Sequence, residues 1–401
     1  MFRLKEKHFD QLNGFAFAML LAMPVIRHDI IALPAPAVIL PALILLLTAG
    51  IRLFNYGTVK FSINSIGYLY FVLLLFLYLL LSGFWHSFGL SLTQDIVKII
   101  FIVFVSTAVI LTFNLRAAEH FINWVIFFSV IATILLISYY VQAASLRGYG
   151  IGNYLTRAQL IGVGALACYS KLLFNPANHR KLYLFLTVLL FLGLALSLAR
   201  AAFLTGVVLA ITVTLFYFHT HKTRSYSLTE WFVNKSTRIV GFVFIGLVIF
   251  AALQVERTAA RLRSLLGGSL GARQDLWENS MTGFFEAPFI GYGLGSSGMV
   301  SAESATYYPH NLYLQVLIDG GIIAFLLLLS ITIYPLIYSY RLYMNGYLTL
   351  KTYVWIPIIT CYSFLLLEFA KSSNFYDARV FVALGVVSVI VVDQLRRFKT
   401  K

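Results

Sequence analysis

Residues 310–338 read HNLYLQVLIDGGIIAFLLLLSITIYPLIY, and Asp319 is the only acidic residue among them. From Gly320 to Tyr338 no residue is charged. A run of about 20 apolar residues is what a helix needs to cross the hydrocarbon core of a membrane. The stretch therefore predicts a membrane-spanning helix, with the polar pair His310 and Asn311 directly before it.

The rest of the chain repeats this pattern. Of its 401 residues 60% are hydrophobic and 11% are charged, with a mean hydropathy of +0.86, whereas soluble domains are about 25% charged. This composition excludes a soluble enzyme and predicts an all-α, polytopic membrane protein with about twelve spans. We expect the spans at 12–26, 31–49, 64–84, 95–113, 121–142, 156–174, 181–199, 201–218, 239–254, 310–338, 352–369 and 379–393.

Other classes of protein fit the sequence less well. A net charge of +15 could indicate nucleic-acid binding, but the basic residues fall in the short gaps between apolar runs, where lipid headgroups and membrane topology explain them. We therefore expect membrane lipids and no nucleic acid as partners. The eight histidines are scattered, Cys168 and Cys361 lie apart in apolar runs, and no HExxH or GxSxG motif occurs. Neither a metal site nor a cofactor is expected.

The basic residues also predict the orientation. Most of the 30 Lys and Arg residues fall in gaps on the side of the two termini, so we expect both termini in the cytoplasm. On the other side the basic residues are arginines, with Lys371 as the exception. Arginine grips phosphate or carboxylate with two parallel donors. An outer face enriched in arginine therefore suggests an anionic ligand, although ordinary headgroup contact is the alternative.

A long segment without a span lies on that outer side. The sequence predicts spans one to nine in 1–254, a long outer loop with short helices in 255–309, and spans ten to twelve in 310–401. Within the loop we expect a helix from Ala272 to about Phe285, which places Arg273 and Trp277 one turn apart, so that the indole could pack on the guanidinium.

A glycine-rich stretch follows that helix. Residues 291–298, GYGLGSSG, superficially resemble a phosphate-cradling loop, but no strand precedes them. The simpler prediction is a tight backbone segment that passes close to a ligand.

Four polar residues near the outer ends of spans or inside them are candidates for chemistry or for internal pairing. His310 begins a helix, where the positive end of the helix dipole favours neutral imidazole, although an interfacial histidine bonded to lipid would look the same. Arg200 separates two apolar runs with almost no loop. Burying an arginine near hydrocarbon is costly, so it needs an ion-pair partner or a function. Asp319 and Glu368 lie inside apolar runs and could form internal ion pairs.

Arg200, Arg273 and His310 are expected on the same outer side, where they could line one outward-facing cavity. A neutral histidine and several arginines there suit transfer from a lipid-linked pyrophosphate donor. The arginines would neutralise the leaving diphosphate, and the histidine would take a proton from an acceptor hydroxyl. Arg147, Arg157 and Arg261 are further candidates for contacts with donor or core phosphates, and Asn311 for binding substrate.

Together these motifs resemble the O-antigen ligase family, whose superfamily includes O-antigen polymerases and protein O-oligosaccharyltransferases. The resemblance rests on the many spans, Ser197-Leu198-Ala199-Arg200, the Arg273-to-Trp277 spacing, and Pro309-His310-Asn311 with Gly320-Gly321 downstream. The motifs lie between about 195 and 325. One departure is the sparse glycine after the histidine, since Ile322, Ile323 and Ala324 follow Gly320-Gly321.

The resemblance implies a GT-C-like, metal-independent glycosyltransferase. It would move O-antigen polysaccharide from undecaprenyl pyrophosphate to the lipid A–core acceptor at the periplasmic face of the bacterial inner membrane. By the same resemblance His310 matches the essential histidine and acts as acceptor base, while Arg200 and Arg273 match essential arginines that hold the pyrophosphate.

Two other functions stay open from the sequence. An O-antigen polymerase of the same superfamily shares the chemistry and differs in its acceptor. A membrane transporter or flippase would explain the many spans and the intramembrane Asp319 and Glu368, but transporters often carry internal repeats, and none is evident in the sequence.

Overall fold

The computed structural model describes most of the chain. The described residues are 6–27, 39–56, 63–85, 93–143, 154–174, 179–197, 199–221, 246, 273–302, 309–348, 354–372 and 378–399.

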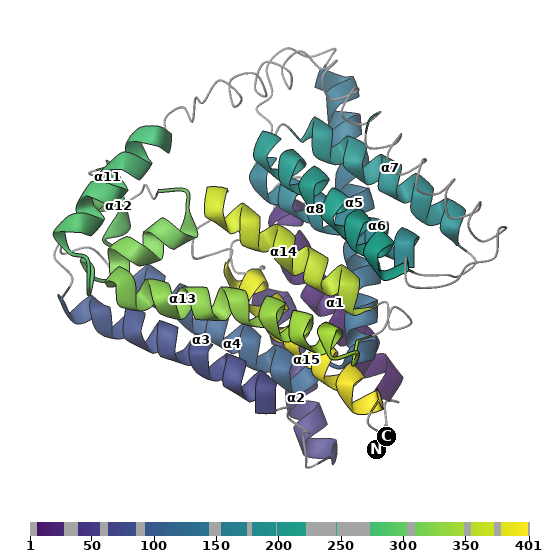
Figure 1. Ribbon diagram of the computed structural model, residues 1–401, viewed down its shortest axis with the longest axis horizontal. Helices are drawn as coiled ribbons and strands as arrows, with labels where there is room; N and C mark the ends of the chain where they lie inside the picture. The colour runs from purple at the N-terminus through teal and green to yellow at the C-terminus, as the bar shows by residue number, and fades with distance from the viewer. Residues whose placement is uncertain are drawn as a thin grey trace. The chain divides into compact units, whose positions relative to one another are not determined.

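These residues form thirteen α-helices and one short 3-10 helix, η3 (Figure 1). Their bounds are α1 Glu6–Val25, α2 Leu40–Tyr56, α3 Ile63–Ser82, η3 Gly83–Trp85, α4 Thr93–Thr112, α5 Leu115–Ala143, α6 Tyr154–Phe174, α7 Arg180–Leu196, α8 Arg200–His221, α11 Arg273–Glu286, α12 Ser297–Ala302, α13 Leu312–Met344, α14 Trp355–Ser372 and α15 Ala378–Lys399.

The prediction of an all-α protein is confirmed for the described part of the chain. Five of its helices are long and apolar enough to cross a membrane, namely Ile63–Trp85, Asp95–Thr112, Leu115–Tyr139, Leu312–Met344 and Ala378–Arg397. Shorter apolar helices run over Leu40–Phe54 and Ala201–Tyr217. This is the pattern of a multi-pass membrane protein. The predicted span 239–254 lies almost entirely outside the described residues.

The second helix differs from its prediction. We expected 31–49. Residues 31–38 lie outside the described residues, and α2 runs over Leu40–Tyr56, past the predicted end. Pro41 is its second residue, where the missing N–H costs nothing because the first turn of a helix has no intrahelical acceptor for it. Pro34 and Pro36 lie outside the described residues. Proline therefore marks the beginning of this helix rather than a kink inside it.

The chain divides by packing into two compact units. Unit 1 comprises Met1–Leu20, Pro36–Phe121 and Ser269–Lys401, and unit 2 comprises Leu21–Ala35 and Ile122–Gly268. The division into spans and outer loop at residues 254 and 309 concerns the membrane instead, and it stays a prediction.

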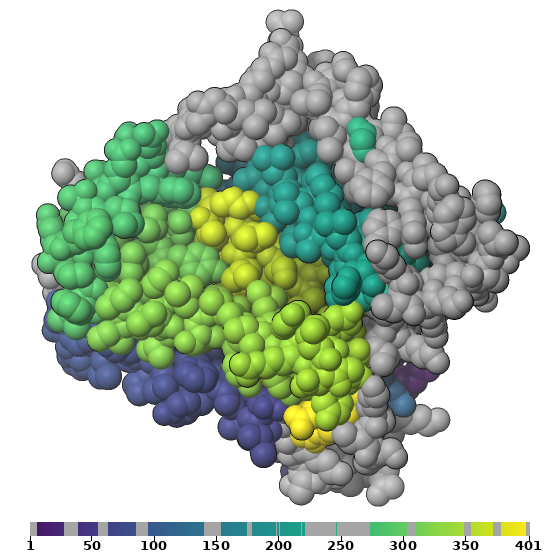
Figure 2. Space-filling view, in the orientation of Figure 1, coloured from purple at the N-terminus to yellow at the C-terminus, as the bar shows by residue number. Residues whose placement is uncertain are grey.

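Helix α15 is the core of unit 1. It packs against α3, α4, α13 and α14, and 94% of its most apolar stretch is buried. A helix that is apolar all round belongs inside a bundle. Gly385 lets the ring of Tyr68 from α3 approach its backbone, because a Cβ there would overlap the tyrosine hydroxyl. Figure 2 shows α13, in yellow-green, lying along α3, in blue-violet.

Polar side chains of unit 1 gather at the two ends of α4. At its C-terminal end Arg52 pairs with Asp10 at 3.2 Å and donates to the Thr112 carbonyl at 2.5 Å. At its N-terminal end Lys98 pairs with Asp95. The helix has 20 residues, a length of about 30 Å, which matches the hydrocarbon core of a bilayer. The apolar middle and polar ends therefore suit a membrane span.

Proline inside α13 is compensated by a neighbouring helix. Pro335 has no N–H, so the carbonyl of Ile331 loses its intrahelical donor. The hydroxyl of Tyr362 on α14 lies 3.3 Å from that carbonyl oxygen and 3.0 Å from the oxygen of Thr332. In a membrane no water can satisfy such a group, so a side chain from the bundle must.

Replacing that hydroxyl tests the compensation. Tyr362→Phe should lower the free energy of unfolding in detergent by about 1 kcal/mol. Pro335→Ala returns an N–H to the helix, so Tyr362→Phe should cost less in that background. Tyr340→Phe on α13, 62% exposed, is the control and should change nothing. If Tyr362→Phe lowered the free energy of unfolding equally with and without Pro335, the Tyr362 hydroxyl would not compensate for the missing N–H.

Candidate functional site

Helix α13, which contains nearly all of the predicted span 310–338, is broken. Within α13 Gly321 has φ 65° and ψ −164°, which is not helical, so residues 312–320 and 322–344 form two segments. Only glycine adopts this conformation freely. The predicted span at 310–338 is thus one helix interrupted near its polar beginning, and Asp319 lies at the break rather than in the middle of a continuous helix.

A loop segment closes the break by exchanging backbone hydrogen bonds with it. We call residues 288–293 the closing segment. The amide of Tyr292 donates to the carbonyl of Ile318, and that of Gly293 to the carbonyl of Asp319, both at 2.9 Å. In return the amide of Ile322 donates to the carbonyl of Pro288 at 2.9 Å. Groups that a continuous helix would pair internally are therefore satisfied by another part of the chain.

Close approach of two backbones requires glycine on both sides. A Cβ on Gly291 would overlap the carbonyl oxygen of Ile318, and one on Gly321 would overlap the carbonyl of Phe289. Both glycines also have positive φ. The predicted tight backbone segment at 291–298 therefore exists. Its amides at Tyr292 and Gly293 are occupied by α13, which leaves them unable to cradle a phosphate.

Asp319 joins the same structure through its side chain. The carboxyl is fully buried, and its Oδ1 accepts from the amide of Ser297 at 2.8 Å. Ser297 is the first residue of α12, so its amide has no acceptor within the helix, and the carboxyl oxygen of Asp319 supplies one. The carboxyl thus holds α12 against the break. Glu368, in contrast, forms the predicted ion pair, with Lys371 at 3.0 Å.

His310 is held in a strained backbone conformation. Its φ is 52°, a value that residues other than glycine seldom adopt, and such strain persists only where neighbours impose it. On one side the indole of Trp277 donates to the Pro309 carbonyl at 2.8 Å. On the other side Asn311 caps α13, accepting from the amides of Tyr313 and Leu314. The backbone of His310 is therefore fixed at the beginning of α13.

Arg273 lies beside this histidine and is anchored independently. It is the first residue of α11, one residue from the predicted beginning of that helix. Its Nη1 donates at 2.8 Å to the carbonyl of Lys371, in the last turn of α14. A cation is favourable there because the last carbonyls of a helix carry partial negative charge. The indole of Trp277 bonds Pro309 rather than packing on Arg273 as predicted.

Burial and charge keep His310 neutral. Its pKa lies below the ordinary 6.5, chiefly because the half-buried ring is desolvated and also because Arg273 is positive. Both causes disfavour imidazolium. The ring is therefore able to accept a proton at pH 7, as its place at a helix N-terminus predicts.

Two other candidate arginines begin helices of unit 2. Arg157 lies in the first turn of α6 and is buried, and Arg200 is the first residue of α8. The hydroxyl of Tyr169 on α6 bonds that of Thr214 on α8 at 2.5 Å. Because α7 between them reverses the chain, α6 and α8 run parallel, and this bond sets their register. Arg157 and Arg200 therefore lie at the same end of unit 2.

Some of the other predicted positions lie within the described residues and some lie outside them. Arg147 and Arg261 lie outside the described residues. The junction at Arg200 is as short as predicted, since α7 ends at Leu196 and α8 follows at Arg200. The sequence did not predict the break at Gly321 or the role of the Lys371 carbonyl as acceptor for Arg273. The one signal for the break was the paired glycine inside an apolar run. Within the described ranges no three His, Cys, Asp or Glu side chains are grouped to hold a metal.

Fold and site together define a class. This is an α-helical, multi-pass membrane protein in which a broken helix presents a neutral histidine beside an arginine.

Comparison with known families gives a match over part of the chain. Residues 185–329 match the family model described as O-Antigen ligase, and Arg200, Arg273, His310 and Asn311 all lie within that match. The similarity that the sequence motifs indicate is thus confirmed over this segment. A search of curated proteins finds no match.

Alanine substitution tests the closing segment. Gly291→Ala and Gly321→Ala should each lower the free energy of unfolding by at least about 2 kcal/mol, because a Cβ meets the facing backbone at positive φ. Gly67→Ala in α3 is the matched control, since nothing lies within 4 Å of its Cβ position. It should raise stability by about 0.5 kcal/mol. Similar behaviour of all three variants in denaturant would refute the close approach.

A titration tests the electrostatics of His310. Arg273→Gln removes the positive charge but leaves the burial, so the pKa of His310 should rise while staying below 6.5. Arg273→Lys keeps the charge and should leave the pKa low. NMR titration of the ring in detergent, assigned with His310→Ala, measures this. An unchanged pKa in Arg273→Gln would mean that the arginine does not act on the imidazole.

Proposed function

We propose that this protein is an O-antigen ligase that transfers O-antigen polysaccharide from undecaprenyl pyrophosphate to lipid A–core. The observation that carries the proposal is the neutral imidazole of His310, fixed beside Arg273 within the segment that matches the family. A fixed base beside a fixed cation is what attack by a hydroxyl on a diphosphate-linked sugar requires.

In the proposed reaction a hydroxyl oxygen of the core sugar bonds to the anomeric carbon of the donor. The bond from that carbon to the diphosphate oxygen breaks, and its electron pair leaves with the diphosphate. His310 takes the hydroxyl proton, and Arg273 stabilises the negative charge that develops on the leaving group. The arginine can do so while anchored, because one of its five N–H donors suffices for the Lys371 carbonyl.

Other residues have proposed roles based on their chemistry. Arg200, inside the family match, is proposed to hold the pyrophosphate, and Arg147, Arg157 and Arg261 to contact donor or core phosphates. Asn311 is proposed to bind substrate in addition to capping α13. We propose catalysis without a metal, because guanidinium groups supply the positive charge.

The proposed setting is the bacterial inner membrane. About twelve spans in a GT-C-like arrangement, with cytoplasmic termini, would place His310 on the periplasmic face. The excess of basic residues on the side of the termini supports this orientation.

The second candidate is an O-antigen polymerase of the same superfamily. It is favoured by the sparse glycine after Gly320-Gly321. A transporter has less support. Transporters coordinate ions with the exposed carbonyls of broken helices, whereas here the carbonyls of Ile318 and Asp319 accept from the closing segment.

A deletion strain separates ligase from polymerase. Loss of a ligase leaves lipid A–core without polysaccharide while lipid-linked polymer accumulates. Loss of a polymerase leaves core that bears a single repeat, and that result would contradict the proposal. Lipopolysaccharide gels read both outcomes.

The same strain tests the arginines by complementation. Arg200→Lys and Arg273→Lys should restore attachment at least about tenfold less well than the wild type, because they keep charge and lose the planar fork. Arg341→Lys in the last turn of α13 is the control and should restore it fully. Full restoration by all three would mean that charge alone suffices.

A further inference from the structure

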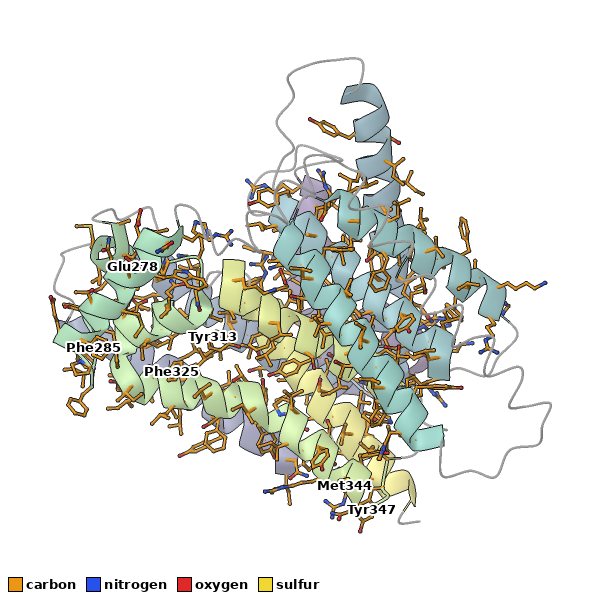
Figure 3. All side chains as sticks on the ribbon, turned by 45° about the horizontal axis from the view of Figure 1, so that its top comes forward. Glu278, Phe285, Tyr313, Phe325, Met344 and Tyr347 are labelled. Carbon is orange, nitrogen blue, oxygen red and sulfur yellow. The ribbon has the colours of Figure 1, made fainter. Side chains whose placement is uncertain are left out.

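The exposed side of α11 changes character along the helix. Gln274, Glu278, Met281 and Phe285 are spaced at 3.6-residue periodicity, so they lie on one side. The first two are polar and the last two apolar. Figure 3 labels Glu278 and Phe285, which lie about 10 Å apart along the axis by the helical rise. A helix with a polar beginning and an apolar end on one side suits passage through a polar–apolar boundary rather than exposure to water.

The apolar end of α11 continues into a larger exposed patch, which we call the apolar seat. Its members are bulky side chains of α11, of the closing segment and of η3. They are Phe84, Trp85, Met281, Phe285, Phe289 and Ile290, with exposures of 87%, 36%, 38%, 70%, 71% and 49%. Between Asn279 and Tyr292 the only charge is Glu286, and the hydroxyl of Tyr292 donates to it at 2.6 Å.

Three contacts fix the apolar seat beside two membrane spans. The indole of Trp85, at the end of the candidate span Ile63–Trp85, donates to the Ile290 carbonyl at 3.3 Å. The Pro288 carbonyl accepts from Ile322, directly after the break in α13. The backbone of Phe289 lies against Gly321. The apolar seat is thus level with the end of the first span and with the break in α13.

The patch is also continuous with the side chains that these spans expose. Leu77 and Leu81 of α3 are 54% and 45% exposed, and Ile323 and Leu326 of α13 are 42% and 55% exposed. In a span such residues face lipid. Aromatic residues, and Trp above all, concentrate where acyl chains meet headgroups. Both the position and the composition of the patch therefore match that boundary.

We propose that the apolar seat is inserted into the membrane at the boundary between acyl chains and headgroups, with lipid as its partner. Insertion fixes the depth of the closing segment and hence of the helix break that it completes. Glu278, two turns before Phe285 on the same side of α11, remains in water. The depth of these side chains is independent of any reaction, so it does not rest on the proposed function.

Spin-label depth measurements test the apolar seat. In the full chain the buried Cys168 and Cys361 are first changed to alanine. One cysteine is then introduced per variant, by Phe285→Cys, Phe289→Cys, Glu278→Cys or Leu326→Cys. Each is labelled with a nitroxide in vesicles of phosphatidylethanolamine and phosphatidylglycerol. Collisions with oxygen, which concentrates in lipid, are compared with collisions with a water-soluble nickel chelate.

Labels at Phe285 and Phe289 should show a ratio of oxygen to nickel collisions severalfold higher than at Glu278 and approaching that at Leu326. Ratios equal to that at Glu278 would overturn the proposal, because the patch would then face water. Low collision with both reagents would also overturn it, because a protein surface would then cover the patch. Phe285 and Phe289 are separate readouts, so failure of one variant to fold leaves the other.

Discussion

The exchange of backbone hydrogen bonds between the closing segment and the break in α13 is the constraint on which the rest of the site depends. A helix interrupted at Gly321 leaves the carbonyls of Ile318 and Asp319 and the amide of Ile322 without helical partners, and each such group is costly where water is absent. The segment from Pro288 to Gly293 satisfies all three. Because Gly291 and Gly321 permit the close approach, the outer segment and the span form one rigid structure.

The candidate catalytic residues are attached to this structure. Helix α11 leads directly into the closing segment, and its Trp277 and Arg273 reach Pro309 and Lys371. His310 thus lies between a carbonyl held by α11 and a cap supplied by Asn311. The same residue has a strained φ and a pKa lowered by burial and by the charge of Arg273. Positioning of this kind contributes to catalysis because no reorganisation is needed during the reaction.

The sequence predicted most helices, since apolar runs between charges suffice to locate spans. It also predicted α11 to within one residue at each end and the place of His310 before α13, because caps and proline are local signals. It could not predict the break, because paired glycine inside a span is compatible with a continuous helix. The hydrogen bonds from Arg273 to Lys371 and from Trp277 to Pro309 join residues 98 and 32 positions apart. Local pattern contains no information on such pairs, which is also why the expected packing of Trp277 on Arg273 failed.

His310 is proposed to act in metal-independent transfer to lipid A–core. The most direct measurement gives purified protein in detergent both undecaprenyl-pyrophosphate-linked glycan and lipid A–core, with EDTA present, and compares the wild type with a His310→Ala variant of equal thermal stability. The account predicts that only the wild type attaches polysaccharide to the core. Attachment by His310→Ala at the wild-type rate, or attachment by the wild type only after a divalent metal is restored, would contradict it.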